Sequence, residues 1–448
     1  MIKIKNRFIF SRAQLIAFGF AIIILIGTVL LMLPFSSKNG TSTNFLGALF
    51  TATSATCVTG LVVYDTFSHW SVFGQVIIIT LIQIGGLGFI TFGVFGMTLL
   101  KKKIGLKERE LVHDSLNSMH LGGSVNLVRN VIKGTFLIEA IGAALLSLKF
   151  IPEFGFIKGI YYSIFHSVSA FCNAGFDLMG CKGAFSSLTS YSDDILINVV
   201  IMSLIVIGGI GFIVWDDVYK NKLRFKKYML HTKIVITFTT LFLIGGTIFF
   251  FVSESNGLFS EMSFKEKILA SAFSSVTPRT AGFNTVDIAA LSESGKLMSV
   301  LLMLIGGAPD STAGGIKVTS IAAIFFFIIS YIKKEKGYRA FKRNLEEDII
   351  KKASTVFFIN LSLALFGTFV ITLTNNVSSI DAAIETFSAI STVGMSVGIT
   401  RDINVLSKLI LIILMYCGRV GSLSFALSFS ERRYVPDIKY PKEEIIIG

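Results

Sequence analysis

The sequence is poor in charged residues. Only 15% of its 448 residues are Asp, Glu, Lys or Arg, whereas 52% are hydrophobic, and the mean hydropathy is +0.73. A soluble protein of this length needs a larger polar surface to stay dispersed. Apolar runs of about twenty residues recur along the chain, each long enough to cross about 30 Å of hydrocarbon. The sequence therefore predicts an all-α integral membrane protein whose first apolar run is an uncleaved span, because no cleavage site follows it.

The sequence also has few residues that could hold a metal ion or a nucleotide. Its four cysteines form no CxxC pair and its five histidines no HExxH spacing, which argues against a zinc site, a disulfide framework or a metalloenzyme. Neither GxGxxG nor a Walker A sequence is present, so no nucleotide is expected on this chain. We find no convergent nucleophile, base or metal set, and the chain is predicted not to be an enzyme.

The basic residues are concentrated in a few stretches between the apolar runs. Of 41 Lys and Arg residues, 27 fall in five segments, which are 1–12, 101–126, 216–233, 333–352 and 431–448. The loops on the other side of the apolar runs carry far fewer. This asymmetry follows the positive-inside rule and places both termini in the cytoplasm. A nucleic-acid interface would need a contiguous soluble surface, which this chain does not offer.

Two apolar spans lie between successive basic segments, which predicts eight crossings in four units of the same orientation. Such units relate by an axis along the membrane normal, unlike the inverted repeats of many secondary transporters. Only the span within 297–332 is plainly broken by its sequence. The predicted units are 12–100, 127–215, 230–332 and 352–430, followed by a cytoplasmic tail at 431–448.

Each unit holds a shorter apolar stretch between its two spans, and each stretch ends in a glycine-containing turn. The length of about 10–14 residues suits a re-entrant helix better than a span. When the terminal glycines are aligned, three units share a Ser-Ala pair six residues upstream, at Ser54, Ser169 and Ser388, whereas the third has Val276 and Thr277. Small residues recur in membrane helices for other reasons, but recurrence at the same place in four units favours a repeat.

The residues before each glycine are small or modest in size, and we call these four triplets the four strips. Non-helical backbone at membrane depth is tolerated only where protein buries it or it lines a water-filled cavity. Glycine permits the conformation that turns consecutive carbonyls inward, and rings of carbonyls can replace the water around K⁺. Asp177 is the only acid that adjoins the strips, so no carboxylate ring is expected. The predicted ion-binding residues of this pore-loop filter are Val58, Thr59, Gly60, Asn173, Ala174, Gly175, Thr280, Ala281, Gly282, Thr392, Val393 and Gly394.

At this point the sequence resembles a known group. The stretches TCVTGL, CNAGFD, TPRTAGF and STVGMS, with GGLGF and GGIGF after the first two, are similar to the Ktr/Trk/HKT superfamily of potassium transporters, and above all to bacterial Ktr-type membrane subunits. The resemblance implies K⁺ uptake across the bacterial cell membrane by a homodimer. It also implies a cytosolic ring of RCK (KTN)-type subunits that binds the regulating nucleotide. A single glycine per loop, in place of TVGYG, implies looser selectivity, so Na⁺ permeation or dependence stays open.

The segment 296–333 is too long for one ordinary span, since at 1.5 Å per residue it would exceed about 50 Å. Its middle breaks a helix, because four glycines and a proline fall in ten residues. A simple kink would explain this, but the resemblance implies an intramembrane gating loop below the filter, and relatives usually carry glycine where Asp310 stands. We call this segment the inner loop; its residues are Gly306, Gly307, Ala308, Pro309, Asp310, Ser311, Thr312, Ala313, Gly314 and Gly315.

Arg419 lies near the middle of the last expected span. A lone Arg at that depth costs about 2.5–3.5 kcal/mol on insertion scales, so it should face protein or water. The superfamily resemblance implies an arginine in the pathway at this point, where it would repel a cation. The alternative is a structural ion pair with Glu139 or Asp310. Lys317 could contact carbonyls of the inner loop or extend toward the membrane surface.

Two other polar residues near the strips have a structural interpretation. The guanidinium of Arg279 is expected to tie the third loop to a neighbouring acid or carbonyl. His166 is expected to be packed and hydrogen-bonded rather than a proton relay. A secondary transporter of small solutes remains an alternative function; it would show inverted repeats and broken helices in both halves.

Overall fold

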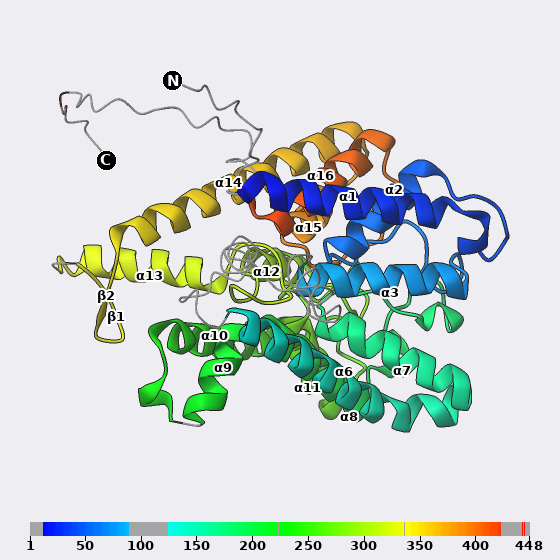
Figure 1. Cartoon of the computed structure of the whole chain (residues 1–448), viewed down its shortest axis with the longest axis horizontal. Coiled ribbons are helices and arrows are strands. Elements are labelled where there is room, and N and C mark those ends of the chain that lie inside the picture. The colour runs from blue at the N-terminus through cyan, green and yellow to red at the C-terminus, as the bar shows by residue number, and fades with distance from the viewer. Residues whose placement is uncertain are drawn as a thin grey trace, which may run out of the picture.

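The computed structural model describes residues 12–88, 124–222, 224–335 and 337–422, together with 441 and 443. The described chain is mostly helical, and α1 (Arg12–Met32), α3 (Val72–Leu87) and α13 (Val318–Ile332) run along the long axis of the molecule (Figure 1). The predicted helical membrane architecture is present. The two terminal basic segments and most of 101–126 lie outside the described residues, as does nearly all of the tail 431–448.

Within the described part, four helices are long and apolar enough to cross a membrane, or five spans if one bent pair is counted. The four occupy α1, α6 (Ser124–Phe154), α10 (Leu230–Glu254) and α14 (Glu347–Thr374). Each begins one of the predicted units. The second expected spans, 71–100 and 406–430, correspond to α3 and α16 (Val405–Val420) and extend beyond the described residues, so the count of eight crossings stays a prediction.

Two of the expected second spans are broken, not one. The expected break in 297–332 separates α12 (Glu293–Leu304) from α13. The span expected at 194–215 is also broken, because α8 (Ile195–Gly209) and α9 (Phe212–Asn221) meet at 96°. The sequence-based statement that only one span is broken was therefore wrong. The physical reason is Gly211, whose φ of +93° ends the helix at a conformation that favours glycine.

A short helix follows the first span of each unit, where the sequence predicts a re-entrant helix. Three of these helices begin at a polar N-cap, because the side chains of Asn44, Ser263 and Ser378 accept hydrogen bonds from first-turn amides. The four short helices are α2 (Phe45–Thr56), α7 (Phe156–Phe171), α11 (Phe264–Val276) and α15 (Ser379–Ile390).

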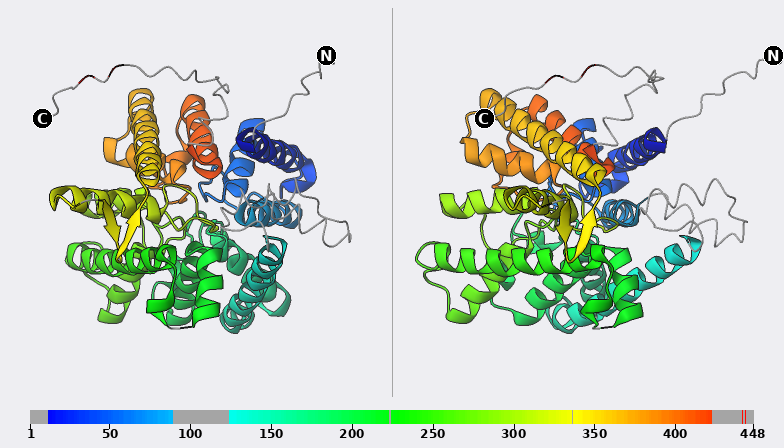
Figure 2. Two further views of the ribbon diagram at one scale, coloured as in Figure 1. Left: turned by 60° about the vertical axis from the view of Figure 1, so that its left-hand side comes forward. Right: turned by 90° about the vertical axis from the view of Figure 1, so that its left-hand side faces the viewer.

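The helices of the four units surround a common centre. Figure 2 shows the blue, cyan, green and orange parts of the chain as four groups about that centre. In each unit the long first helix packs against its own short helix, as α1 does against α2. Each second helix also packs against the short helix of the next unit: α3 on α7, α8 on α11, α12 on α15 and α16 on α2. The last contact returns to the first unit, so the arrangement closes on itself.

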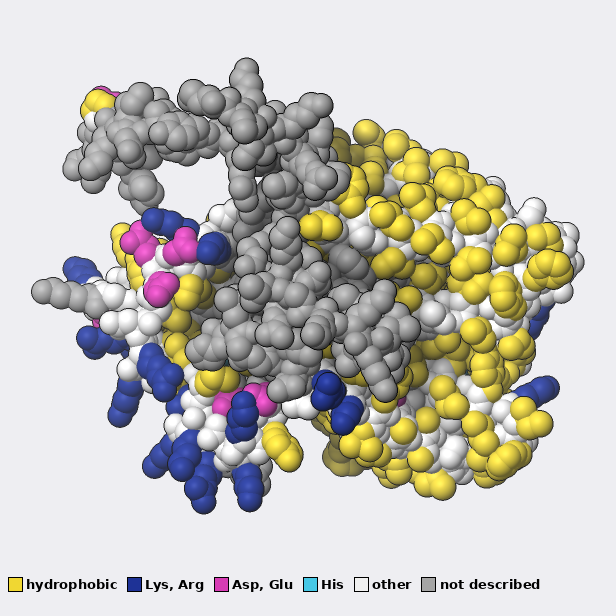
Figure 3. Space-filling view, viewed as in Figure 1, with side chains coloured by type: hydrophobic (Ala, Val, Ile, Leu, Met, Phe, Trp, Pro, Cys, Tyr) yellow, Lys and Arg dark blue, Asp and Glu magenta, His cyan; other side chains and the backbone are white. Residues whose placement is uncertain are grey.

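The surface separates apolar from basic regions. Hydrophobic side chains cover the broad right-hand part of the molecule in Figure 3, whereas Lys and Arg gather at the left and lower left, where α9 and the strands lie. The apolar region suits contact with lipid, and the basic side chains gather at the other end of the molecule.

A small hairpin was not predicted by the sequence analysis. Strands β1 (Tyr338–Ala340) and β2 (Arg343–Leu345) pair antiparallel, with Ala340 opposite Arg343. The two turn residues, Phe341 and Lys342, have φ of +47° and +65°, as a tight two-residue hairpin requires. Neither residue is the glycine or asparagine that would have marked the turn.

Candidate ion pathway

The four strips directly follow the C-terminal ends of the four short helices. A helix C-terminus carries partial negative charge on its unpaired carbonyls. Cys57, Cys172 and Ser391 cap α2, α7 and α15, and Thr277 caps α11. All four negative helix ends therefore point at the strips, which favours a cation there.

The strips share one backbone pattern. In each strip the first and third residues have positive φ, with an intervening residue outside that region. The first residues are Val58, Asn173, Thr280 and Thr392, with φ between +51° and +69°; the third are Gly60, Gly175, Gly282 and Gly394, with φ between +69° and +94°. Left-handed conformations are costly for Val and Thr. Their recurrence in all four loops shows that the loops are held in one shape.

The four strips meet edge to edge in a closed ring. A Cβ built on Gly60 would lie 2.5 Å from the carbonyl oxygen of Ala174, and one on Gly175 would lie 2.7 Å from that of Ala281. A Cβ on Gly282 would lie 2.5 Å from the Val393 carbonyl oxygen. The fourth strip contacts the first in the same way, since a Cβ on Gly394 would lie 2.2 Å from the carbonyl oxygen of Thr59. Only glycine fits at these four positions without displacing a neighbouring strip.

Side-chain hydroxyls brace every strip from behind, in two different ways. The hydroxyls of Ser54 and Ser388 accept hydrogen bonds from the amides of Gly60 and Gly394, at 3.1 and 3.0 Å. In the second unit Ser169 instead donates to the Phe176 carbonyl at 2.7 Å. The third unit lacks the serine, but a hydroxyl one position later makes the same bond as in the second unit: Thr277 donates to the Phe283 carbonyl at 2.5 Å. The third strip is therefore supported by a hydroxyl although its sequence differs at Val276 and Thr277.

A polar cavity of about 350 Å³ opens on one side of the ring. It is lined by all four ring glycines and by four charged side chains, Asp65, Asp177, Asp287 and Arg401. We call it the outer cavity. Asp177 is the only acid that adjoins the strips along the sequence, but it is not the only acid that lines the cavity. Asp65 and Asp287 lie five residues beyond Gly60 and Gly282, and the chain folds back to bring them to the cavity wall.

The charge of Asp177 depends on its surroundings. Burial raises the pKa of this carboxyl to about 7, and the nearby Asp65 charge adds to the rise, while the Met179 amide, which donates at 2.9 Å, opposes it. Asp177 is therefore expected to ionise at a higher pH than an ordinary aspartate does.

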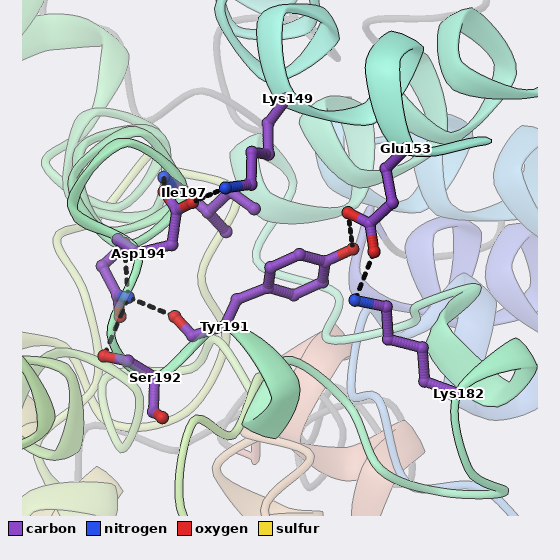
Figure 4. A network of polar contacts seen from close by, with 8 residues as sticks. Lys149, Glu153, Lys182, Tyr191, Ser192, Asp194 and Ile197 are labelled. Atoms are coloured by element: carbon purple, nitrogen blue, oxygen red, sulfur yellow. Dashed lines mark hydrogen bonds and ion pairs between the residues drawn. The ribbon is translucent and has the colours of Figure 1, made fainter. Parts of the chain in front are cut away.

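The outer part of the second loop is tied to α6 and α8 by a polar network (Figure 4). Glu153 accepts from the Tyr191 hydroxyl at 2.8 Å and forms an ion pair with Lys182. Lys149 pairs with Asp194 at 2.7 Å. These contacts hold the segment after the second strip against α6 and α8. The ion pairs join residues far apart in the chain, so they could not be assigned before the fold was known.

The inner loop lies on the opposite side of the ring from the outer cavity. A Cβ on Gly314 would lie 2.1 Å from the hydroxyl oxygen of Thr392, and one on Gly315 would lie 3.0 Å from Ser391. The Thr312 hydroxyl donates to the Phe171 carbonyl at 3.1 Å. The loop is thus packed directly against the ends of α7 and the fourth strip.

The broken helix α8–α9 holds the inner loop from the side. The Ala308 amide donates to the Gly209 carbonyl at 2.9 Å, and the Phe212 amide donates to the Asp310 carbonyl at 2.8 Å. A Cβ on Gly211 would lie 2.6 Å from the Pro309 carbonyl oxygen. The break in α8–α9 and the inner loop therefore fit one another, and each supplies the other's unpaired backbone groups.

Two basic side chains hold the inner loop to its surroundings. Arg419 donates to the carbonyls of Thr312, Gly85 and Gly86, the last at 3.1 Å, and so joins the inner loop to the end of α3. Lys317 donates to the Ala313 carbonyl at 2.6 Å. Glu139, one of the alternative partners of Arg419, accepts a hydrogen bond from the Gln83 amide at 3.0 Å.

Gly85 of GGLGF, Gly208 of GGIGF and Gly418 of the last unit also have a structural role here. A Cβ on Gly85, Gly208 or Gly418 would lie 2.0 Å from the last carbonyl of the short helix in its own unit, at Thr56, Phe171 and Ile390 respectively. These glycines let each second helix approach the strips closely. Their recurrence was a signal that the sequence analysis quoted but did not explain.

Comparison with known proteins identifies the family. The profile of TrkH, described as a cation transport protein, matches residues 11–435. The chain belongs to this family of cation transport proteins. It is 42% identical to the potassium/sodium uptake protein NtpJ of Enterococcus hirae over 445 residues, 98% of this chain and 97% of that one. It is also 42% identical to the Ktr system potassium uptake protein B of Bacillus subtilis over 441 residues, again 98% and 97%.

A solved structure shows the same fold. The crystal structure of the potassium transporter TrkH from Vibrio parahaemolyticus matches with a TM-score of 0.73, covering 96% of this chain and 86% of that one at 17% identity. The resemblance predicted from the sequence is confirmed, and the chain is a transport protein rather than an enzyme.

The structure also places the two residues given a structural interpretation. His166 is fully buried; its Nδ1 lies 2.8 Å from the Tyr162 carbonyl and its Nε2 accepts from the Leu178 amide at 3.3 Å. Arg279 donates to the Thr239 carbonyl at 3.2 Å and to the Gly306 carbonyl at 3.5 Å. Both contacts are those of packed residues.

Proposed function

We propose that the chain is the membrane subunit of a K⁺ uptake system, in which cations pass through the ring of four strips. The observation that carries the proposal is the closed ring itself, with matching backbone conformations in all four strips and four helix C-termini facing it. Carbonyl oxygens in such a ring can replace the hydration shell of K⁺. The names of the relatives, a potassium/sodium uptake protein and a potassium uptake protein, support K⁺ as cargo and leave Na⁺ as a second permeant or required ion.

The test is ion flux in proteoliposomes that contain the purified chain. Uptake of K⁺, Na⁺ and a neutral solute is compared in the same vesicles. We expect K⁺ uptake to exceed Na⁺ uptake and the neutral solute to be excluded. Uptake of the neutral solute would favour a secondary transporter and would contradict the proposal.

We further propose that the inner loop and Arg419 form the gate. The loop packs beneath the ring against Thr392 and Phe171, and Arg419 ties it to α3. Opening then requires the loop to leave these contacts. A simple kink would leave flux unchanged when the ties are removed, so flux of the variants described below decides between the two interpretations.

The proposed topology is four parallel units, eight crossings and both termini in the cytoplasm, with the outer cavity facing the medium. The chain offers a direct test because Cys181 is exposed whereas Cys57, Cys172 and Cys417 are buried. A membrane-impermeant maleimide should label Cys181 in intact cells. Labelling only after the cells are opened would reverse the orientation.

The proposed assembly is a homodimer on a cytosolic RCK-type ring that binds the regulating nucleotide. It rests on the family and on the basic surface of the end that carries α9 and the hairpin (Figure 3). The tail 431–448 is the proposed dimer contact. Deletion of 435–448 should shift the purified chain from dimer to monomer in light scattering, and an intact dimer would contradict that role.

A further inference from the structure

The outer cavity carries charges of both signs. Of the residues that line it, Asp65, Asp177 and Asp287 are acidic and Arg401 is the one base. The three acids outnumber the one base, so the charges of the cavity wall attract cations toward the ring. The guanidinium opposes this attraction for every cation that reaches the ring glycines.

Arg401 makes two side-chain contacts, one with each of two loops. Its guanidinium carbon lies 4.1 Å from the centre of the Phe185 ring, a cation–π distance. Its Nε donates to the Gly398 carbonyl at 3.1 Å, and a Cβ on Gly398 would lie 2.6 Å from its Nη2. The side chain is exposed, and these contacts favour one position for its charge in the cavity wall.

The segment that carries Arg401 is anchored from below by a buried carboxylate. Glu385, on α15, is fully buried and accepts from the Ser396 hydroxyl at 2.6 Å, from the Val397 amide at 3.2 Å and from the Thr400 hydroxyl. On the other side, the Phe185 amide donates to Asp65 at 2.9 Å. Residues from the first, second and fourth units thus fix the position of one guanidinium.

We propose that Arg401 sets how strongly the outer cavity concentrates cations and that it disfavours divalent cations relative to K⁺. The inference rests on the proposed function. A unit charge about 10 Å from a cation, with an effective dielectric near 50, changes the occupancy of a monovalent ion about threefold. The same potential acts on twice the charge of a divalent ion, so its occupancy changes by the square, about ninefold. Arg401 thereby weakens divalent occupancy more than K⁺ occupancy.

The experiment measures K⁺ uptake by the full chain in proteoliposomes, with and without external Mg²⁺. In Arg401→Gln we expect the KM for K⁺ to fall about threefold with maximal rate unchanged. The Mg²⁺ concentration that halves uptake, measured at K⁺ well below its KM, should fall about ninefold. Both shifts should shrink as choline chloride is added, because salt screens exposed charges. Arg401→Lys keeps the charge and should retain most of the wild-type behaviour.

A matched control separates a local from a general charge effect. Lys158 is also exposed and is not among the residues that line the outer cavity, so Lys158→Gln removes one positive charge elsewhere and should change neither value. The inference would be overturned if Arg401→Gln and Lys158→Gln shifted the two values equally. It would also be overturned if the KM for K⁺ and the half-inhibiting Mg²⁺ concentration changed by the same factor in Arg401→Gln, or if Mg²⁺ did not inhibit this variant.

The two proposals fail in different ways. If wild-type protein shows no K⁺ uptake above empty vesicles, the proposed function fails. If wild type transports K⁺ and Arg401→Gln matches Lys158→Gln, only the role of Arg401 fails. A lower maximal rate in Arg401→Gln that Arg401→Lys does not restore would indicate that the side chain only supports the loop.

Discussion

The two sides of the ring differ in symmetry. On the ring, four units contribute equivalent strips with the same backbone conformation, and each second helix packs on the next unit in the same way. Beneath it, one unit supplies the inner loop, another the bent helix α8–α9 that holds it, and a third supplies Arg419. In the proposed function, the symmetric ring selects the ion and the asymmetric inner loop is the element that moves.

The difference also extends to how each region is held. The strips are braced by hydroxyls and by the close approach of their own neighbours. The inner loop is held by backbone hydrogen bonds to α8–α9 and by two basic side chains on carbonyls. Two of the contacts that hold the inner loop are side-chain hydrogen bonds, so a single substitution can remove either of them without changing the backbone.

The largest effect is expected where symmetry is strictest, at the ring glycines. In Gly394→Ala the new Cβ would lie 2.2 Å from the Thr59 carbonyl oxygen, at a residue with φ of +93°, so the fourth and first strips must separate. We expect K⁺ uptake to fall at least about tenfold and K⁺/Na⁺ discrimination to be lost, given that a left-handed residue alone costs about 1–2 kcal/mol. Flux in proteoliposomes measures both.

The matched control is Gly40→Ala, which has a similar φ of +68° but no atom within 4 Å of the added Cβ. It should cost a little stability and leave selectivity intact. Normal uptake and selectivity in Gly394→Ala would break the comparison, because the ring would then not be where ions are chosen.

The next effect tests the asymmetric side. Arg419→Ala removes the bonds from the inner loop to α3 and a positive charge that, at about 10 Å and an effective dielectric near 20, repels a cation by roughly 1.7 kcal/mol. We expect uptake to rise severalfold, up to about tenfold, with selectivity unchanged. Unchanged or lower flux in protein that reaches the membrane in normal amounts would argue against a barrier at this point.

The repeated strips and the break within 296–333 could be predicted from the sequence, whereas the contacts between units could not. Gly60, Gly175, Gly282 and Gly394 were found by alignment because repetition makes a pattern visible. The bend at Gly211, the carbonyl contacts of Arg419 and the place of Asp65 in the outer cavity depend on pairings between units. Such pairings are set by packing across long separations and leave no local signal.

A smaller effect concerns the outer cavity and pH. Because the pKa of Asp177 is raised to about 7, its carboxyl is largely neutral at external pH 6 and largely ionised at pH 8. The added negative charge attracts cations, so the KM for K⁺ should fall about threefold as external pH rises across this range. Asp177→Asn should remove the dependence and keep the higher KM throughout.

Asp193→Asn is the control for that titration, since Asp193 is exposed and is not among the residues that line the outer cavity. Its pH profile should match wild type. If the KM for K⁺ rose with pH, or if its pH dependence persisted in Asp177→Asn, the titration would belong to another group.

The smallest effect distinguishes the two kinds of brace behind the strips. Ser388→Ala leaves the buried Gly394 amide without the acceptor that lies at 3.0 Å, and an unpaired buried donor costs about 1–3 kcal/mol. Ser169→Ala leaves only the Phe176 carbonyl without its donor, and carbonyls tolerate loss of a partner better than amides do. The melting temperature in detergent should therefore be lower for Ser388→Ala than for Ser169→Ala. The control is Ser147→Ala, which should have nearly the wild-type melting temperature because the Ser147 hydroxyl bonds only the Ala144 carbonyl of its own helix. The reverse order of melting temperatures would mean that the hydroxyls stabilise the strips through packing rather than through the hydrogen bond from the strip amide. The shape of the ring would then depend on the contacts between the glycines alone.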